Sequence, residues 1–244
     1  MAVEYINRLS SIANSTSPTK TGTSTGNFTL LTKDVVIAHV VANPTSNQLP
    51  TASISNSAGA SIQWSQLSSQ ATSPNTTSTT LGTISTIFIG LVTSGGTASV
   101  TTNLSNGTYT VQLNVYQFRG LSTTQVNSPY KSIGDTTPQG PGEFITPSGN
   151  AGDLVIWFNS MTALGTYTPT YSTSTEGGTW STGQTNGGGT TYAQSSTTQY
   201  KILTNSGAQN AFYTNNYVTT RPWVMQAFVI AAADSLYTGW GSPI

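Results

Sequence analysis

The sequence predicts an all-β protein, a jelly-roll β-sandwich of about eight main strands built from two similar halves. Three observations lead to this prediction. Short runs of β-branched and aromatic residues alternate with clusters of Ser, Thr, Gly and Asn, which is typical of strands joined by turns. No long segment carries apolar residues at the helical period. Two series of motifs recur in the same order along the chain.

The composition indicates a folded domain despite its polarity. The chain has 244 residues, of which close to a third are Ser or Thr, and its 7 basic and 7 acidic residues cancel. Disordered chains usually combine high net charge with few aromatic residues, whereas this chain has 5 Trp, 11 Tyr and 7 Phe. Its length suits a single large β-sandwich.

Charge and hydropathy exclude several classes of partner. The few Lys and Arg residues are dispersed along the chain, so we expect no nucleic-acid partner and no anionic membrane surface. The chain has no Cys, which excludes disulfides and thiolate sites. No apolar run is long enough to span a bilayer, and the N-terminus has no apolar signal region, so we expect no membrane partner and no secretion by a signal peptide.

The expected organisation is an arm, a sandwich and a tail. We expect an extended N-terminal arm at residues 1–29, a β-sandwich at 30–233 and a C-terminal tail at 234–244. Within the sandwich, halves 30–121 and 151–233 are joined by a Pro-rich crossover at 122–150, which should cross the surface because Pro disfavours helices and central strands. Two small independent domains are the alternative organisation.

Strands are expected wherever apolar or alternating runs lie between turn signals. Ser94-Gly95-Gly96 and Asn106-Gly107 are such signals, and the second is typical of tight hairpins. The expected strands are Asp34–Val41, Ala52–Ser55, Ile62–Leu67, Thr83–Val92, Ala98–Leu104, Tyr109–Phe118, Asp153–Asn159, Thr168–Ser172, Tyr192–Leu203, Ala211–Val218 and Pro222–Ala232.

The internal repeat supports one sandwich rather than two domains. Asp34-Val35-Val36-Ile37 matches Asp153-Leu154-Val155-Ile156, Trp64 matches Trp180, Ser94-Gly95-Gly96 matches Ser206-Gly207-Ala208, and Val111–Phe118 matches Trp223–Ile230. Because repeat-equivalent positions need burial on one face, the residues expected to face a single shared core are Val36, Val115, Ile156 and Phe228.

The order of these motifs resembles a known group of proteins. An Asp-led strand, a Trp turn, a Ser-Gly-Gly hairpin, a strand ending in Phe118-Arg119-Gly120 and a Pro-rich crossover are followed by a second copy. This order resembles jelly-roll, concanavalin-like sandwich domains of tailed-phage minor virion proteins, such as head decoration and tail proteins. The resemblance covers roughly Asp34 to Ala233, with Lys33 where Gly is usual, and it implies a fold and a virion role rather than a ligand.

Few residues could carry chemistry. His39, the only histidine, lies in mid-strand without metal or triad partners nearby, so we expect a satisfied histidine in the core or on a sheet face. Asp34 and Asp153 begin strands and should accept backbone N–H bonds in the preceding turn. A hydrolytic carboxylate pair drawn from crossover residues such as Asp135 and Glu143 has the weakest support. We therefore expect no enzyme, no catalytic or metal-ligating residues and no cofactor.

Trp64 and Trp180 have two interpretations. Their repeat-equivalent positions favour packing in the core, whereas an exposed indole could stack on a sugar ring. Stacking would make these two residues a glycan site.

The expected function is that of a non-enzymatic virion structural protein. It would be a capsid decoration, minor capsid, head-fibre or tail-associated subunit, assembled in the host cytoplasm. Its partners would be the major capsid protein or other virion proteins and copies of itself. The expected assembly contacts are the apolar residues of the two ends: Val3, Tyr5, Ile6, Leu9, Leu236, Tyr237, Trp240 and Ile244. The alternative is a carbohydrate- or receptor-binding module on a tail or cell surface, with a surface glycan as partner.

Overall fold

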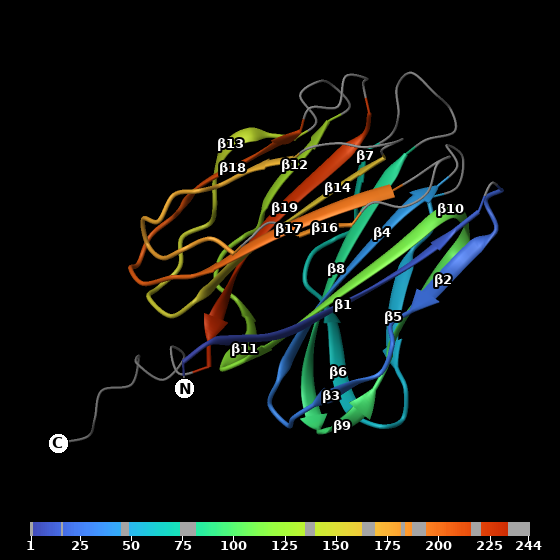
Figure 1. The fold of residues 1–244 in the computed structure, drawn as a ribbon, viewed down its shortest axis with the longest axis horizontal. Coiled ribbons are helices and arrows are strands. Elements are labelled where there is room, and N and C mark those ends of the chain that lie inside the picture. Colours follow the sequence, from blue (N-terminus) through green and yellow to red (C-terminus); the bar gives the residue numbers. More distant parts are fainter. Residues whose placement is uncertain are drawn as a thin grey trace.

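A computed structural model describes residues 2–15, 17–44, 49–73, 82–134, 140–162, 169–181, 184–186, 194–215 and 221–233. All regular elements in these ranges are β-strands, and they form several antiparallel sheets. The all-β prediction is therefore confirmed. Figure 1 shows the first half of the chain, blue to green, beside the second half, yellow to red.

The first half forms an eight-stranded sheet and a small two-stranded sheet. The large sheet has the order β1-β10-β4-β8-β6, with β2 and β5 also paired to β10 and β7 to β8, while β3 pairs with β9. The bounds are β1 (Glu4–Asn14), β2 (Lys20–Ser24), β3 (Phe28–Leu30), β4 (Val35–Pro44), β5 (Ala52–Asn56), β6 (Ser61–Gln66), β7 (Ala71–Ser73), β8 (Thr83–Ser94), β9 (Gly96–Ala98) and β10 (Val100–Arg119).

The second half forms a six-stranded sheet and a three-stranded sheet. The six-stranded sheet has the order β11-β19-β14-β17-β16, with β12 also paired to β19, and the three-stranded sheet has the order β13-β18-β15. The bounds are β11 (Leu121–Gln125), β12 (Tyr130–Gly134), β13 (Gly142–Ile145), β14 (Leu154–Thr162), β15 (Pro169–Tyr171), β16 (Gln184–Asn186), β17 (Gln194–Ile202), β18 (Asn210–Asn215) and β19 (Trp223–Ala232).

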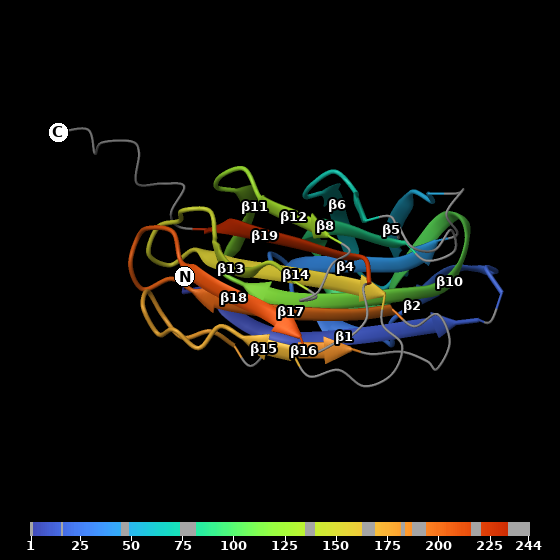
Figure 2. The same ribbon diagram turned by 90° about the horizontal axis from the view of Figure 1, so that it is seen from above.

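Residues of both halves build one common core, here called the shared core. β14 and β19 pack against β8, and β17 packs against β4. Figure 2 shows the strands of both large sheets running in a similar direction, as in aligned sandwiches. The main members of the shared core are Val35, Ile37, Ile87, Ile89, Tyr116 and Phe118 from the first half and Leu154, Ile156, Phe158, Phe228 and Ile230 from the second.

Two further cores lie on the outer faces of these sheets. In β4, Val36, Ala38 and Val40 face the first-half core, and in β14, Val155 and Trp157 face the second-half core. Both strands are buried along their whole length. Burial on two faces explains why they are continuous apolar runs rather than alternating ones.

The core prediction is therefore confirmed in part. Val36, Val115, Ile156 and Phe228 are all fully buried. Ile156 and Phe228 line the shared core as expected, but Val36 and Val115 face the first-half core. A strand buried on both faces has two inward sides, and alternation alone does not say which one a residue occupies.

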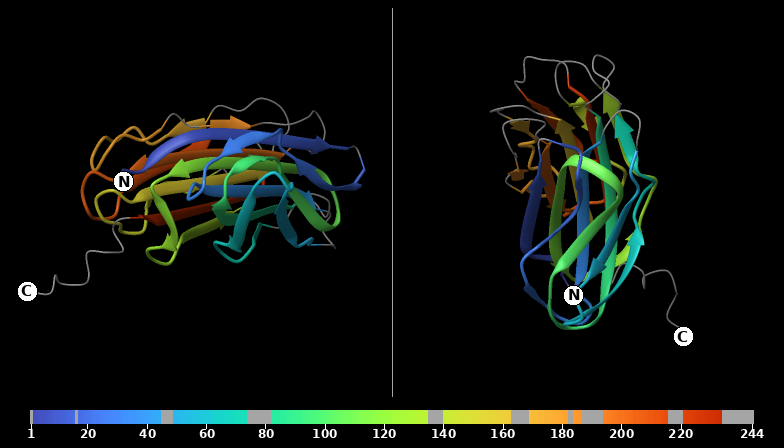
Figure 3. Two further views of the ribbon diagram at one scale, coloured as in Figure 1. Left: turned by 90° about the horizontal axis from the view of Figure 1, so that it is seen from below. Right: turned by 90° about the vertical axis from the view of Figure 1, so that its right-hand side faces the viewer.

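The expected N-terminal arm instead contributes β1, β2 and the start of β3, and β1 lies at the edge of the large sheet. β1 pairs with β10 from Glu4–Arg119 to Asn14–Thr110, with a register shift after Tyr5. Figures 1 and 3 show β1, in dark blue, running along the length of the molecule. Val3 and Tyr5 pack on the shared core and Leu9 on the first-half core, so these side chains serve the chain's own fold.

Two other expectations differ from the structure. Asn106-Gly107 is not a hairpin, because β10 continues through it for 20 residues. A strand so long pairs with different neighbours along its length, and its register to β2 shifts between Asn103 and Thr108. The Pro-rich crossover is also not merely a surface connection, since it supplies β12 and β13, and its Pro residues fall outside both strands.

Candidate functional site

His39 lies between the two large sheets and is fully buried. Its Nε2 atom is 3.0 Å from Ser85 Oγ and 2.8 Å from Ser160 Oγ, which come from different halves. Ser85 Oγ also donates to Gln226 Oε1, and Nδ1 of His39 has no hydrogen-bonding partner among the described residues. Burial lowers the pKa of His39 to about 3. The predicted core position of His39 is therefore confirmed, but the prediction that its ring is fully hydrogen-bonded is not, because Nδ1 has no partner among the described residues.

Further polar contacts join the halves beside the shared core. Their side chains are all buried, so the interface between the two halves is part of the protein interior rather than a binding surface. Each hydrogen bond of this kind contributes about 1 kcal/mol. The contacts join Thr83 Oγ1 to Thr162 Oγ1 at 2.9 Å, Asn114 Nδ2 to Ser196 Oγ at 2.8 Å and Tyr116 Oη to Thr198 Oγ1 at 2.7 Å.

Asp34 and Asp153 accept backbone N–H bonds, as predicted. Asp34 Oδ2 accepts from Leu31 N at 2.9 Å, and Asp153 Oδ2 accepts from Asn150 N at 2.8 Å. Asp34 Oδ1 also binds Arg119 Nε at 3.0 Å, while Asp153 Oδ1 accepts from the amide of residue 232. Both carboxylates are fully buried and occupied by these contacts. They stabilise turns and are not available to a substrate.

The two tryptophans considered for glycan stacking are packed against the protein. Trp180 is only 7% exposed and belongs to the second-half core, so it cannot stack on a sugar ring. Trp64 is half-buried over Gly90, and its Nε1 donates to Asn56 Oδ1 at 3.2 Å. The expected tail contacts Leu236, Tyr237, Trp240 and Ile244 lie outside the described residues.

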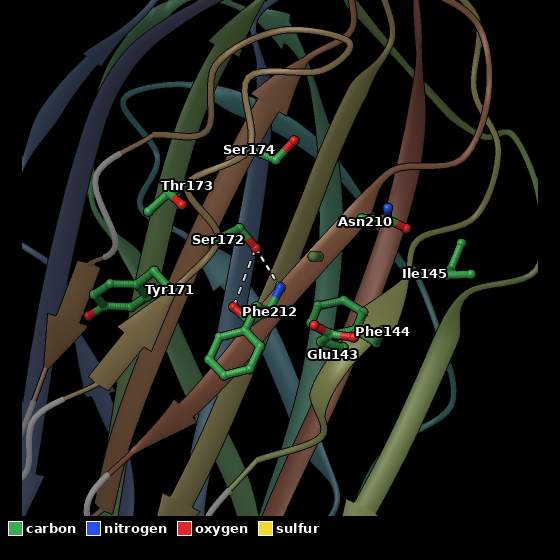
Figure 4. A pocket seen from close by; sticks show the side chains of 10 residues that line it. Glu143, Phe144, Ile145, Tyr171, Ser172, Thr173, Ser174, Asn210 and Phe212 are labelled. Carbon is green, nitrogen blue, oxygen red and sulfur yellow. Dashed lines mark hydrogen bonds between the residues drawn. The ribbon is translucent and has the colours of Figure 1, made fainter.

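A hollow of about 640 Å³ lies on the three-stranded sheet. The hollow is defined by Glu143, Phe144, Ile145, Tyr171, Ser172, Thr173, Ser174, Asn210, Ala211 and Phe212 (Figure 4). Its residues come from β13, β18, the end of β15 and the segment that follows β15. It is within the size range of small-molecule sites.

The floor of the hollow is the sheet face that points away from the second-half core. Glu143 pairs with Phe212 and Ile145 with Asn210 across β13 and β18, so these four side chains share one face. Phe144, between them, points to the opposite side and joins the second-half core. Phe212 therefore lies at the centre, with a carboxylate and an amide beside it.

Side chains from the neighbouring sheet hold one wall of the hollow in place. Ser172 Oγ accepts from Phe212 N at 2.6 Å and donates to Phe212 O at 3.3 Å, as Figure 4 shows. Gln199 Nε2 donates to Ser172 O at 3.2 Å, and Lys201 Nζ donates to Ser174 O at 3.3 Å. Gln199 and Lys201 are both buried, and they reach the wall from β17.

Lys201 is held by carbonyl oxygens and an aromatic ring. Besides Ser174 O, its Nζ donates to Glu176 O at 2.6 Å and lies 4.8 Å from the centre of the Trp180 ring. Burial lowers the pKa of Lys201, and the Glu176 carboxylate opposes this shift. The ammonium therefore stabilises the wall segment rather than facing the hollow.

The chemistry available in the hollow is recognition by an aromatic ring, a carboxylate, an amide and hydroxyls. Within the described ranges no three His, Asp or Glu residues gather in a way that could hold a metal ion. No helix in the described part of the chain is long and apolar enough to cross a membrane.

The sequence did not single out this site. From the sequence, Glu143 is only a carboxylate of the Pro-rich crossover, and no motif distinguishes Phe212 or Asn210 as binding residues. The alternation within Asn210–Asn215 could have placed Asn210 and Phe212 on one face. Nothing local indicated that Glu143 lies beside them.

Comparison with known proteins yields no relative. No protein-family model, no curated protein and no solved structure matches this chain.

Proposed function

We propose that this chain is a non-enzymatic structural subunit of a virus particle. The observation that carries the proposal is the β unit of zero net charge, in which β1, two large sheets and a shared core tie both halves together. Such a unit suits a component that resists deformation and binds neighbours without turnover. A near-neutral surface also favours association with other proteins.

We also propose that the two halves are pseudo-repeated copies that together build one jelly-roll β-sandwich, as the sequence resemblance implies. The two large sheets share an order, since β10-β4-β8-β6 corresponds to β19-β14-β17-β16. The turns before Asp34 and Asp153 have corresponding hydrogen bonds, and the preceding residues Lys33 and Gly152 both have positive φ, 75° and 92°. Duplication explains both the repeated motifs and the paired geometry.

In this proposal the subunit contacts the major capsid protein or other virion proteins, and also copies of itself. The C-terminal residues 234–244, with their aromatic side chains, are the proposed anchors, because aromatic anchors dominate interface energetics. Assembly takes place in the host cytoplasm, and no nucleic acid or membrane is a partner.

The test is whether the chain is part of particles. Particles are purified on a density gradient from lysates of cells that produce the chain, and their proteins are quantified by mass spectrometry. The expected result is co-sedimentation at a fixed ratio to the major capsid protein, with release only by denaturant. Immunogold labelling then distinguishes head from tail. Recovery of the chain only in the soluble fraction, with particles that lack it, would overturn the proposal.

Carbohydrate binding is the second candidate function. It is favoured by the hollow on the three-stranded sheet, where an aromatic ring lies between a carboxylate, an amide and hydroxyl groups. Binding of the intact chain to a glycan array tests it, and a chain that binds no glycan lacks this function.

A further inference from the structure

We propose that the hollow binds a neutral saccharide, which stacks on Phe212 and donates hydroxyl hydrogen bonds to Glu143. The proposal rests on the second candidate function, carbohydrate binding, and assigns its site and ligand class. It moves the site away from Trp64 and Trp180, the residues that the sequence suggested.

Phe212 provides the stacking surface. It is the central residue of the floor, lies on the middle strand β18 and is half-buried rather than covered. Its backbone N and O are both bound by Ser172 Oγ, so the strand is fixed beneath the ring. A fixed, half-exposed aromatic face matches the apolar face of a sugar ring.

Polar groups flank the ring on the same sheet face. The Glu143 carboxylate and the Asn210 amide have no side-chain hydrogen bond or ion pair with any other described residue. A carboxylate accepts hydrogen bonds at both oxygens, and an amide both donates and accepts. Adjacent sugar hydroxyls need this combination, because each hydroxyl is itself a donor and an acceptor.

The charge of the hollow selects the ligand class. Glu143 is the only charged residue among those that line it. An unpaired carboxylate repels anionic groups, so sugars that carry carboxylate or sulfate are disfavoured. A neutral saccharide satisfies Glu143 through hydroxyl donors without burying an opposing charge.

The wall of the hollow is organised before any ligand binds. Gln199 and Lys201 are 3% and 1% exposed, and both donate to backbone carbonyls of the wall segment that begins at Ser172. Burying an ammonium group to hold a surface segment is costly unless it is fully hydrogen-bonded. The result is a wall that need not lose conformational freedom on binding, which favours affinity for small ligands.

The experiment uses the full chain and a defined panel of probes. An array presents neutral oligosaccharides of glucose, galactose, mannose and N-acetylglucosamine beside uronate-, sialate- and sulfate-bearing glycans and a trimethylammonium ligand. The best neutral probe is then titrated by calorimetry. The expected result is binding confined to neutral glycans.

Two matched pairs of variants locate the site. Phe212→Ala and Glu143→Gln should each weaken binding about tenfold or more, since a hydrogen bond to a charged group is involved in the second case. The controls are Leu31→Ala, which removes an exposed apolar side chain elsewhere, and Glu4→Gln, which removes an exposed carboxylate elsewhere. Both controls should bind as the unmodified chain does.

The outcomes separate the site from the function. Neutral-glycan binding that survives both Phe212→Ala and Glu143→Gln overturns the assigned site but leaves carbohydrate binding in place. Preference for acidic glycans or for the trimethylammonium probe overturns the ligand class. No binding to any glycan removes both the inference and the second candidate function, while the virion proposal is unaffected.

Discussion

Acid should destabilise this protein through His39. His39 is fully buried between the two large sheets, and burial lowers its pKa from 6.5 to about 3. The unfolded chain binds a proton at this residue below pH 6.5, whereas the folded chain does not until about pH 3. The unfolded state therefore binds more protons between these values, and the free energy of unfolding falls as the pH falls.

The size of the effect follows from the shift. Each pH unit below 6.5 removes about 1.4 kcal/mol of stability. From pH 7.5 to pH 5 the free energy of unfolding should therefore fall by about 2 kcal/mol. His39 is the only histidine in the chain, so no other side chain of ordinary pKa changes charge over most of this range.

Urea unfolding followed by tryptophan fluorescence measures the change. The unmodified chain and His39→Gln are compared at pH 7.5, 6.5, 5.5 and 5, and the difference between their pH slopes isolates His39 from carboxylates. A proton NMR titration of the single imidazole gives an independent measure that needs no variant. It should show a neutral ring throughout this pH range.

Two results would refute this reasoning. One is an imidazole that titrates near pH 6.5 in the folded protein, which would mean that solvent or a charged group reaches His39. The other is an identical pH slope in the unmodified chain and His39→Gln, which would mean that burial of the neutral ring does not couple to folding.

Three substitutions test the packing and the hydrogen bonds. Gly90→Ala should lower stability by about 1–3 kcal/mol, because a Cβ at this position would lie 2.7 Å from a carbon of the Trp64 indole. The control Gly26→Ala places its Cβ in open space and should leave stability unchanged, so equal melting temperatures of the two variants would contradict the packing around Gly90. Asp153→Ala should lower the free energy of unfolding, measured by chemical denaturation, by about 3 kcal/mol, because two backbone amides lose the carboxylate that accepts from them. An unchanged free energy of unfolding would show that water replaces the carboxylate. Tyr5→Ala should lower the free energy of unfolding by about 1–3 kcal/mol, because it removes the ring contacts with Phe118 and Tyr200. Ser10→Ala on the same strand should change it little, and equal effects of the two variants would mean that the side chains of β1 do not stabilise the fold.

The strands of the second half show which features the local sequence can predict. The runs expected at Asp153–Asn159 and Pro222–Ala232 are strands at Leu154–Thr162 and Trp223–Ala232. Continuous apolar residues between turn signals are a local property, and each run needs burial whatever its neighbours are. The turn roles of Asp34 and Asp153 were predictable for the same reason, since their backbone partners lie three residues away.

The pairing of strands that are distant in the sequence could not be predicted from local pattern. Residues 4–14 have only a few apolar side chains, and their fate depends on the free edge of β10, about a hundred residues further along the chain. The same holds for the side on which Val36 and Val115 are buried, which depends on what packs against each face of the sheet.

The candidate site depends on long-range pairing more than any other feature of the molecule. Glu143, Phe212 and Ser174 belong to three segments that are separate in sequence, and each alone is an ordinary strand or turn residue. Composition and local pattern determined that the chain is an all-β protein of zero net charge with repeated turns. Only the tertiary structure brought a carboxylate beside an aromatic ring, because antiparallel pairing of β13 with β18 sets which side chains share a face.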